Sequence, residues 1–124
     1  MKVTNEVLLQ KIDLVVHKLM NLGGANYDQD KVASKESTKA GNIARDFGIE
    51  EWDWPQGVGL YGLQKLESYW GDDRYDEFLD NWYQNNIKIG LPSKNVNTTA
   101  PFLTLANMLD RLNRPEYEKM CLER

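Results

Sequence analysis

Three glycines near the middle of the chain have the spacing of a dinucleotide-binding fingerprint. Gly57, Gly59 and Gly62 form G-x-G-x-x-G within the stretch WDWPQGVGLYG. This fingerprint works only where a strand ends, the glycines turn tightly and a helix N-terminus receives the pyrophosphate. No strand pattern precedes the first glycine, whereas Asp53 suits a helix N-cap and Pro55 suits a first helical turn. The sequence therefore predicts glycines inside a helix, explained by close approach of a neighbouring helix, and we reject NAD as a cofactor.

The other reactive side chains have structural interpretations that we prefer to catalytic ones. His17 has no second His or Cys at ligand spacing, so no metal site is expected. Cys121 is the only cysteine, which excludes an intramolecular disulfide and indicates a packed thiol rather than a nucleophile. Four aspartates have a spacing that could imitate a paired-carboxylate site, but a solvated helix face that complements the helix dipole explains them. They are Asp72, Asp73, Asp76 and Asp80.

Composition limits the class of protein. A chain of 124 residues with 41% hydrophobic and 27% charged residues forms one globular domain at most. The first ten residues contain no uninterrupted apolar run of the kind that a signal peptide needs, and no apolar stretch is long enough to cross a bilayer. The net charge of -4 comes without a basic cluster, which argues against nucleic acid as a partner. We therefore expect a cytoplasmic protein with no membrane and no nucleic-acid partner.

The apolar residues recur at steps of three and four along most of the chain, which is the helical period. Asn97 suits a helix N-cap before Pro101 in the first turn, and Gly71 suits the residue just after a helix. The region between the first two helices is rich in Asp, Lys, Ser and Thr, and predicts a loop. The expected helices cover about residues 5–22, 55–70, 73–86, 98–112 and 115–124, and the polar loop covers about 23–50.

The second half of the chain repeats a pattern of the first half. A shift of 42 residues places Leu63 on Leu105, and it pairs Gly71 with Asn113. A single helical hairpin cannot bury its apolar face alone, so a repeat of this length predicts stacked helical hairpins, in an open solenoid or a closed α/α toroid. Equivalent helix ends then lie on the same rim of the array, where unpaired helix N–H groups and polar side chains meet.

Two segments carry a resemblance to a known family. The stretch RDFGIEEWDWPQGVGLYGLQKL, followed by GLPSKNVNTTAPFLTLANML, resembles the N-terminal part of glycoside hydrolase family 105, the unsaturated rhamnogalacturonyl hydrolases and their relatives. The resemblance runs from about Arg45 to the last residue. It implies an all-α fold, an (α/α)6 barrel or α/α toroid of twelve helices with the site in its mouth. Residues 1–124 would then be the N-terminal portion of a single toroid domain, with about five of the twelve helices.

The resemblance also implies a substrate, a reaction and a set of contacts. In this family an aspartic acid protonates the C4=C5 double bond of an unsaturated uronic acid, water adds at C5, and the hemiketal collapses and releases the sugar. The substrates are oligosaccharides left by pectin lyases, and no metal or organic cofactor is required. Trp54 matches an aromatic position at the substrate site that would cover a sugar face or the apolar wall, and Asn97 matches a polar position that would hold the uronate or assist the acid. Val96 would line the pocket, and Gln56 is a weaker contact.

One departure from the family pattern limits the expected activity. The family's catalytic aspartate lies in a Trp-Asp motif downstream of the Asn97 segment, beyond Arg124, so we expect no proton donor in this chain and no turnover by it alone. Asp53 is the one substitute that we consider, and its N-cap role explains it more simply. The alternative function is a non-catalytic helical-repeat module that binds carbohydrate or another partner. In either case an incomplete array exposes an apolar face, which predicts self-association.

Overall fold

The computed structural model describes residues 4–23 and 48–123, and it contains helices and turns but no strand within these two ranges. The helices are α1 (Asn5–Met20), α3 (Trp54–Trp70), α4 (Asp76–Ile89), α5 (Val96–Asn107), α6 (Leu109–Leu112) and α7 (Pro115–Glu123). The predicted all-α fold class is confirmed. No helix in the described ranges combines the length and the hydropathy needed to span a membrane.

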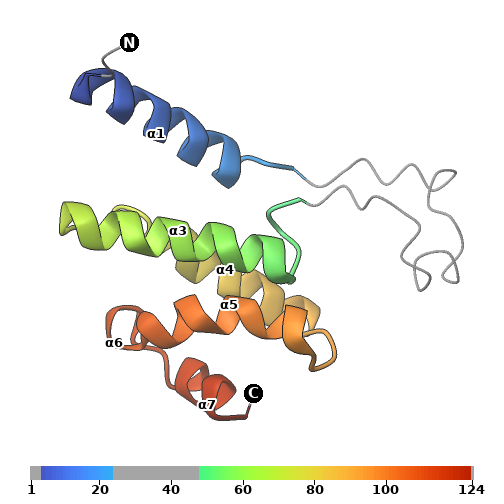
Figure 1. Cartoon of the computed structure of the whole chain (residues 1–124). Coiled ribbons are helices and arrows are strands. Elements are labelled where there is room, and N and C mark those ends of the chain that lie inside the picture. Colours follow the sequence, from blue (N-terminus) through green and yellow to red (C-terminus); the bar gives the residue numbers. More distant parts are fainter. Residues whose placement is uncertain (1–3, 24–47, 124) are drawn as a thin grey trace, which may run out of the picture.

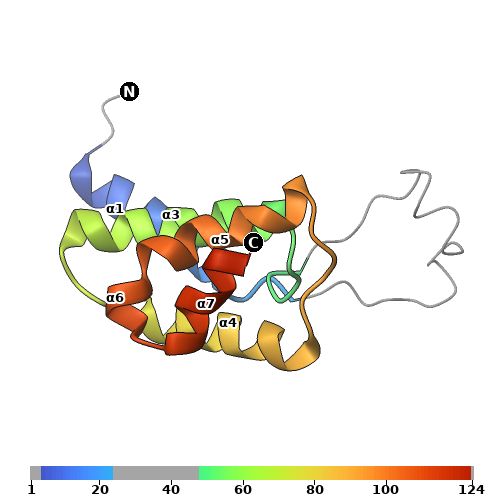
Figure 2. The same ribbon diagram turned by 90° about the horizontal axis from the view of Figure 1, so that it is seen from below.

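Two parallel helices form the centre of the array. α3 and α5 pack side by side and run in the same direction, while α4 runs in the opposite direction to one side of this pair (Figures 1 and 2). α1 lies along α3 on the side away from α5, where the Leu19 side chain approaches Gly59. α7 packs against α5 at the other end of the array. The helix starts of α3 and α5 therefore lie at the same end of the molecule.

The 42-residue repeat predicted from the sequence is confirmed in the helices. The shift carries the first residue of α3, Trp54, onto the first residue of α5, Val96. Gly71 ends α3 with φ 70°, and its equivalent Asn113 ends α6 with φ 49°, so both hairpins turn through the left-handed region. The two hairpins are thus copies of one unit, and each buries its apolar face against the other.

Helix boundaries differ from the predicted ones most clearly in α4 and α5, while α1 ends at Met20 and not at 22, and α4 extends to Ile89 and not to 86. The expected helix over 98–112 is broken at Met108, whose N–H donates to the Leu105 carbonyl three residues back instead of four, so that α5 ends and α6 begins. α4 begins at Asp76, not at 73, because Tyr75 occupies its N-cap position. Most of the polar loop expected over 23–50 lies outside the described residues.

An aromatic cluster joins the hairpins in the core. The rings of Trp52 and Trp82 stack with centroids 5.1 Å apart, and Phe102 meets Trp52 edge-on at 5.0 Å. Tyr83 is fully buried and its hydroxyl donates to the Pro101 carbonyl at 2.8 Å. Aromatic pairs of this kind contribute about 0.5–1.5 kcal/mol each beyond the area that they bury. The cluster lies behind the starts of α3 and α5 and fixes their separation.

Candidate functional site

The helix starts of α3 and α5 form a shared edge that we call the rim, defined by Trp54, Val96 and Asn97. The two helices approach closely just inside it, because a Cβ on Gly57 would lie only 2.8 Å from the Ala100 carbonyl carbon and Cβ. Glycine is therefore required here for packing, and the interpretation of Gly57 as a helix-contact residue is confirmed. The repeat brings to one edge two motifs that are about 40 residues apart in the chain.

The start of α3 is held by a cap and by a buried amide. Asp53 is the N-cap residue, and its Oδ1 accepts from the Trp54 N–H at 2.8 Å, which confirms the N-cap interpretation of this aspartate. Gln56 is only 3% exposed, and its Nε2 donates to the Gly48 carbonyl at 2.7 Å. This glutamine therefore faces inward and anchors the segment that leads into α3.

The start of α5 is held by a capping box two residues earlier than we expected. Asn95, not Asn97, is the N-cap: its Oδ1 accepts from the Thr98 N–H at 3.0 Å, and the Thr98 hydroxyl accepts from the Asn95 N–H at 3.0 Å. The predicted cap at Asn97 is wrong because the reciprocal pair requires a hydroxyl three residues after the cap. Thr98 supplies this hydroxyl to Asn95.

The change of cap leaves Asn97 available for other contacts. Its side chain is exposed and makes no hydrogen bond within the part of the chain that the structure describes. Pro101 has no N–H, so the Asn97 carbonyl also lacks the donor that a helix usually provides four residues on. Asn97 thus offers an amide and a free carbonyl oxygen on the rim.

A buried tryptophan ties the two motifs together. The Trp52 indole N–H donates to the Thr98 carbonyl at 2.8 Å, and Trp82 donates its indole N–H to the Ile49 carbonyl. Trp52 is therefore a core residue that fixes the position of α5 relative to the segment before α3. A hydrogen bond between residues 46 positions apart leaves no local signal in the sequence, so this role of Trp52 could not be predicted from it.

The predicted contact residues differ in exposure. Trp54 is 51% exposed and Val96 is 88% exposed, while Gln56 is buried as described above. A large exposed aromatic side chain on a helix start can lie flat against a sugar ring, and the Asn97 amide beside it can both donate and accept. The Lys94 ammonium donates to the Glu123 carbonyl at 2.6 Å, so it is held against the end of α7.

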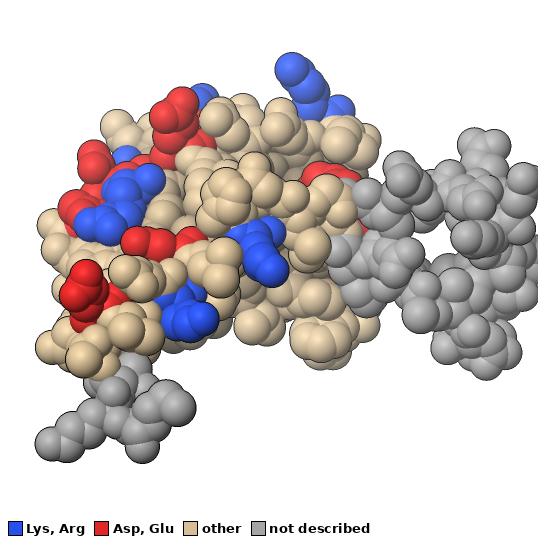
Figure 3. Space-filling view, turned by 90° about the horizontal axis from the view of Figure 1, so that it is seen from above, with Lys and Arg blue, Asp and Glu red and all other residues tan. Residues whose placement is uncertain are grey.

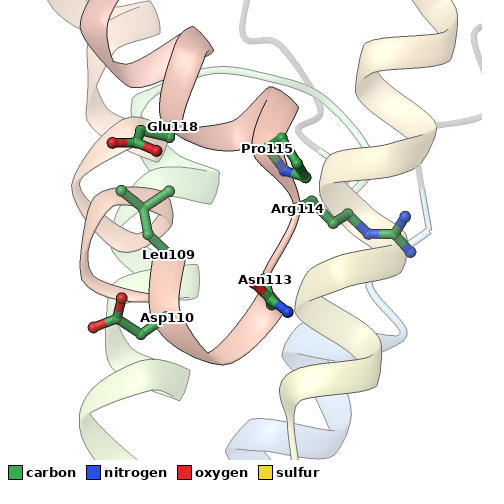
Figure 4. A pocket seen from close by; sticks show the side chains of 6 residues that line it. All are labelled: Leu109, Asp110, Asn113, Arg114, Pro115 and Glu118. Carbon is green, nitrogen blue, oxygen red and sulfur yellow. The ribbon is translucent and has the colours of Figure 1, made fainter.

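A surface hollow lies away from the rim. It is formed at the turn between α6 and α7, and Figure 4 shows the side chains that line it. Arg114 points away from it toward α4, where both oxygens of Asp80 accept from the guanidinium at 2.8 Å. That guanidinium is also the main reason why the pKa of Asp80 is lowered. The hollow contains none of the predicted contact residues.

Other chemistry-bearing groups are structural. Burial raises the pKa of the Cys121 thiol, so its reactive thiolate form is disfavoured. Within the two described ranges, no group of three or more His, Cys, Asp and Glu side chains is placed to hold a metal ion. Basic and acidic side chains are interspersed on the face shown in Figure 3, without a continuous basic patch.

Residues 29–124 match glycosyl hydrolase family 88, and the chain belongs to this family. A curated relative is the unsaturated rhamnogalacturonyl hydrolase YesR of Bacillus subtilis (strain 168), which is 29% identical over 72 residues. That match covers 57% of this chain and 20% of the relative. The chain thus spans about a fifth of the length of this curated relative.

Two solved structures show the same arrangement of helices. Both are described as possible members of family GH105. The protein from Klebsiella pneumoniae is 28% identical with a TM-score of 0.75, and the match covers 97% of this chain and 30% of that one. The protein from Salmonella enterica is 30% identical with a TM-score of 0.72, and the match covers 94% of this chain and 30% of that one. The resemblance to family 105 is confirmed, and with it the fold class of helical hairpins from a partial α/α toroid.

Proposed function

We propose that this chain supplies part of the substrate-binding rim of a glycoside hydrolase that acts on unsaturated rhamnogalacturonyl oligosaccharides in pectin degradation. The observation that carries the proposal is the family match over residues 29–124, together with a relative named for this activity. Exposed Trp54 and Asn97 at adjacent helix starts support it, because sugar recognition combines an aromatic face with amide hydrogen bonds. We keep the cytoplasm as the predicted location.

In this proposal each rim residue has a separate role. Trp54 covers the apolar face of the unsaturated sugar, and Val96 lines the wall beside it. The Asn97 amide donates to the uronate carboxylate, and its free carbonyl accepts from a sugar hydroxyl. Gln56 acts indirectly, because its hydrogen bond to Gly48 keeps the start of α3 in position.

The proposed reaction is hydration of the C4=C5 double bond, with no metal or organic cofactor. A carboxylic acid protonates C4, water adds at C5, and the resulting hemiketal opens and releases the sugar. The acid must hold its proton near neutral pH, which requires a raised pKa. Asp53 is committed to the N-cap of α3, so we expect these 124 residues to bind the sugar without turning it over.

A titration of the chain with an unsaturated rhamnogalacturonyl disaccharide, followed by NMR, tests the proposal. We expect amide shifts at the rim, and we expect W54A and N97A to weaken binding by about tenfold or more, as for loss of one stacking or charge-assisted contact. The matched control is Y69A, which removes an aromatic residue that is 83% exposed near the far end of α3. Equal binding by all three variants would contradict the proposal.

The ultraviolet absorbance of the double bond reports turnover in the same samples. Constant absorbance is the expected result for this chain. Loss of absorbance would require a proton donor among these residues, and D53N would then be the first variant to test.

A second candidate is a self-associating or partner-binding module without turnover. It is favoured by exposed apolar side chains at both ends of the array, among them Leu8 and Val15 on α1 and Leu103 and Leu122 on α5 and α7. Faces of this kind usually mark contact sites.

Sedimentation over a range of concentrations tests self-association. We expect the average mass to rise with concentration, and V15E to reduce this rise because it places a charge on the apolar face of α1. A single monomeric species at all concentrations would exclude self-association as the function.

A further inference from the structure

A buried carboxyl group lies at the opposite end of α3 from the rim. The Glu67 side chain is 0% exposed, although a glutamate is rarely buried without compensation. One of its oxygens, Oε1, accepts from the Tyr75 N–H at the start of α4. Among the residues that the structure describes, the cation in contact is Arg111 on α6, whose guanidinium lies 3.3 Å from Oε2. A single buried carboxylate thus connects the first hairpin to the second.

Asp76 shares this cation and competes for it. Arg111 lies 3.1 Å from Asp76 Oδ2, and it donates to the Asp72 carbonyl at 2.8 Å. Asp76 is also within hydrogen-bonding reach of Glu67. Two carboxyl groups and one guanidinium therefore form a cluster. If both acids are ionised, one of their two negative charges is not neutralised by Arg111.

Two oxygens of the cluster lack a hydrogen-bond donor. Glu67 Oε2 and Asp76 Oδ1 are both buried and neither accepts a hydrogen bond. Ionised carboxylates are acceptors only, so two of them in contact cannot satisfy each other. One proton between them supplies the donor, gives each acid a hydrogen-bond partner, and leaves a single charge for Arg111 to neutralise.

We propose that Glu67 and Asp76 share one proton in the folded protein, and that loss of this proton weakens the connection between the two hairpins. Burial is the largest cause that raises the pKa of Glu67, to about 7, and the Asp76 carboxyl adds to it, while the Tyr75 N–H and Arg111 lower it. The other charged groups nearby are Asp72 and Arg74, which pair with each other at 2.7 Å. On α1, Asp13 faces the Tyr75 side chain and adds a further negative charge.

The sign of the pH effect follows from these pKa directions. The pKa of Glu67 rises from an ordinary value of 4.5 on folding, so the folded state binds more protons than the unfolded state between these two values. Stability contributed by the shared proton is therefore present at low pH and is lost as the pH rises toward about 7. The connection is a pH-sensitive element in the fold, separate from the rim.

Thermal unfolding of the whole chain between about pH 5 and about pH 8 tests the proposal. For the wild type we expect the unfolding equilibrium constant to rise by roughly 10- to 100-fold over this range. E67Q imitates the protonated acid, since its amide donates to Asp76 and its carbonyl accepts from Tyr75, so its stability should change much less. E77Q is the matched control, because Glu77 is an exposed carboxyl group one residue further along α4, and we expect it to retain the wild-type slope.

A second readout does not depend on how the variants fold. The carboxyl carbon of Glu67 in the wild type, followed by NMR, should titrate well above the ordinary value for a glutamate. Equal pH slopes for wild type and E67Q, or a Glu67 carboxyl that titrates near its ordinary value, would each overturn the shared proton.

Discussion

Replacement of Gly57 by alanine is the most direct test of the contact between α3 and α5. The new Cβ would lie 2.8 Å from the carbonyl carbon and Cβ of Ala100 and 2.9 Å from the Pro101 nitrogen. Two of these three atoms are backbone and cannot rotate away, so the helices must separate. Overpacking of this kind lowers stability by about 1–3 kcal/mol, and the better helix propensity of alanine offsets about 1 kcal/mol of this loss. We therefore expect a net loss of up to about 2 kcal/mol of stability for G57A.

The other glycines of the same motif provide the controls. A Cβ on Gly62 meets nothing within 4 Å, so G62A should gain about 1 kcal/mol from helix propensity alone. A Cβ on Gly59 meets only the end of the Leu19 side chain, which can move, so G59A should have a small effect. Urea unfolding followed by circular dichroism measures all three free energies. G57A as stable as G62A would refute the close helix contact.

Three further predictions concern the helix ends and the core. N95A should lower the free energy of unfolding by about 1 kcal/mol because it removes the cap of α5, whereas N97A should leave this free energy almost unchanged. Urea unfolding of the two variants measures the difference. Y83F should lose about 1 kcal/mol because the Pro101 carbonyl loses a buried donor, which thermal unfolding at fixed pH would report. N113A should lower the free energy of unfolding by about 1 kcal/mol, because Asn113 adopts φ 49° and alanine adopts this conformation at higher cost. N113G should be tolerated. An N113A variant as stable as the wild type in the same assay would contradict this prediction.

Local patterns in the sequence predicted the elements and their repetition. Apolar spacing predicted the helices, and the 42-residue shift paired Gly71 with Asn113. The structure places these two residues at the ends of α3 and α6. The helices depend on neighbours within one or two helical turns, which is the range over which apolar spacing reports structure, and the repeat is visible because this local pattern occurs twice. The residue that caps α5 could not be predicted in this way, because Asn95 and Asn97 both suit an N-cap. Only the position of the Thr98 hydroxyl distinguishes them.

Burial of individual polar residues could not be predicted in the same way. Gln56 is a plausible surface contact by sequence, yet it is buried against Gly48. Glu67 is an ordinary polar helix residue by pattern, yet it is enclosed by side chains from α4 and α6. The Trp52 bond to Thr98 likewise joins distant parts of the chain. Such positions depend on which helices pack together.

The sequence by itself determined the all-α class and the repeated hairpin, because both rest on residue types at regular spacing, and two of its segments carry the family resemblance. Only the tertiary structure decided which asparagine caps α5, which polar side chains are buried and which acids meet in the core. These outcomes depend on contacts between residues far apart in the chain, and a helical period specifies which face is apolar but not which neighbour covers it.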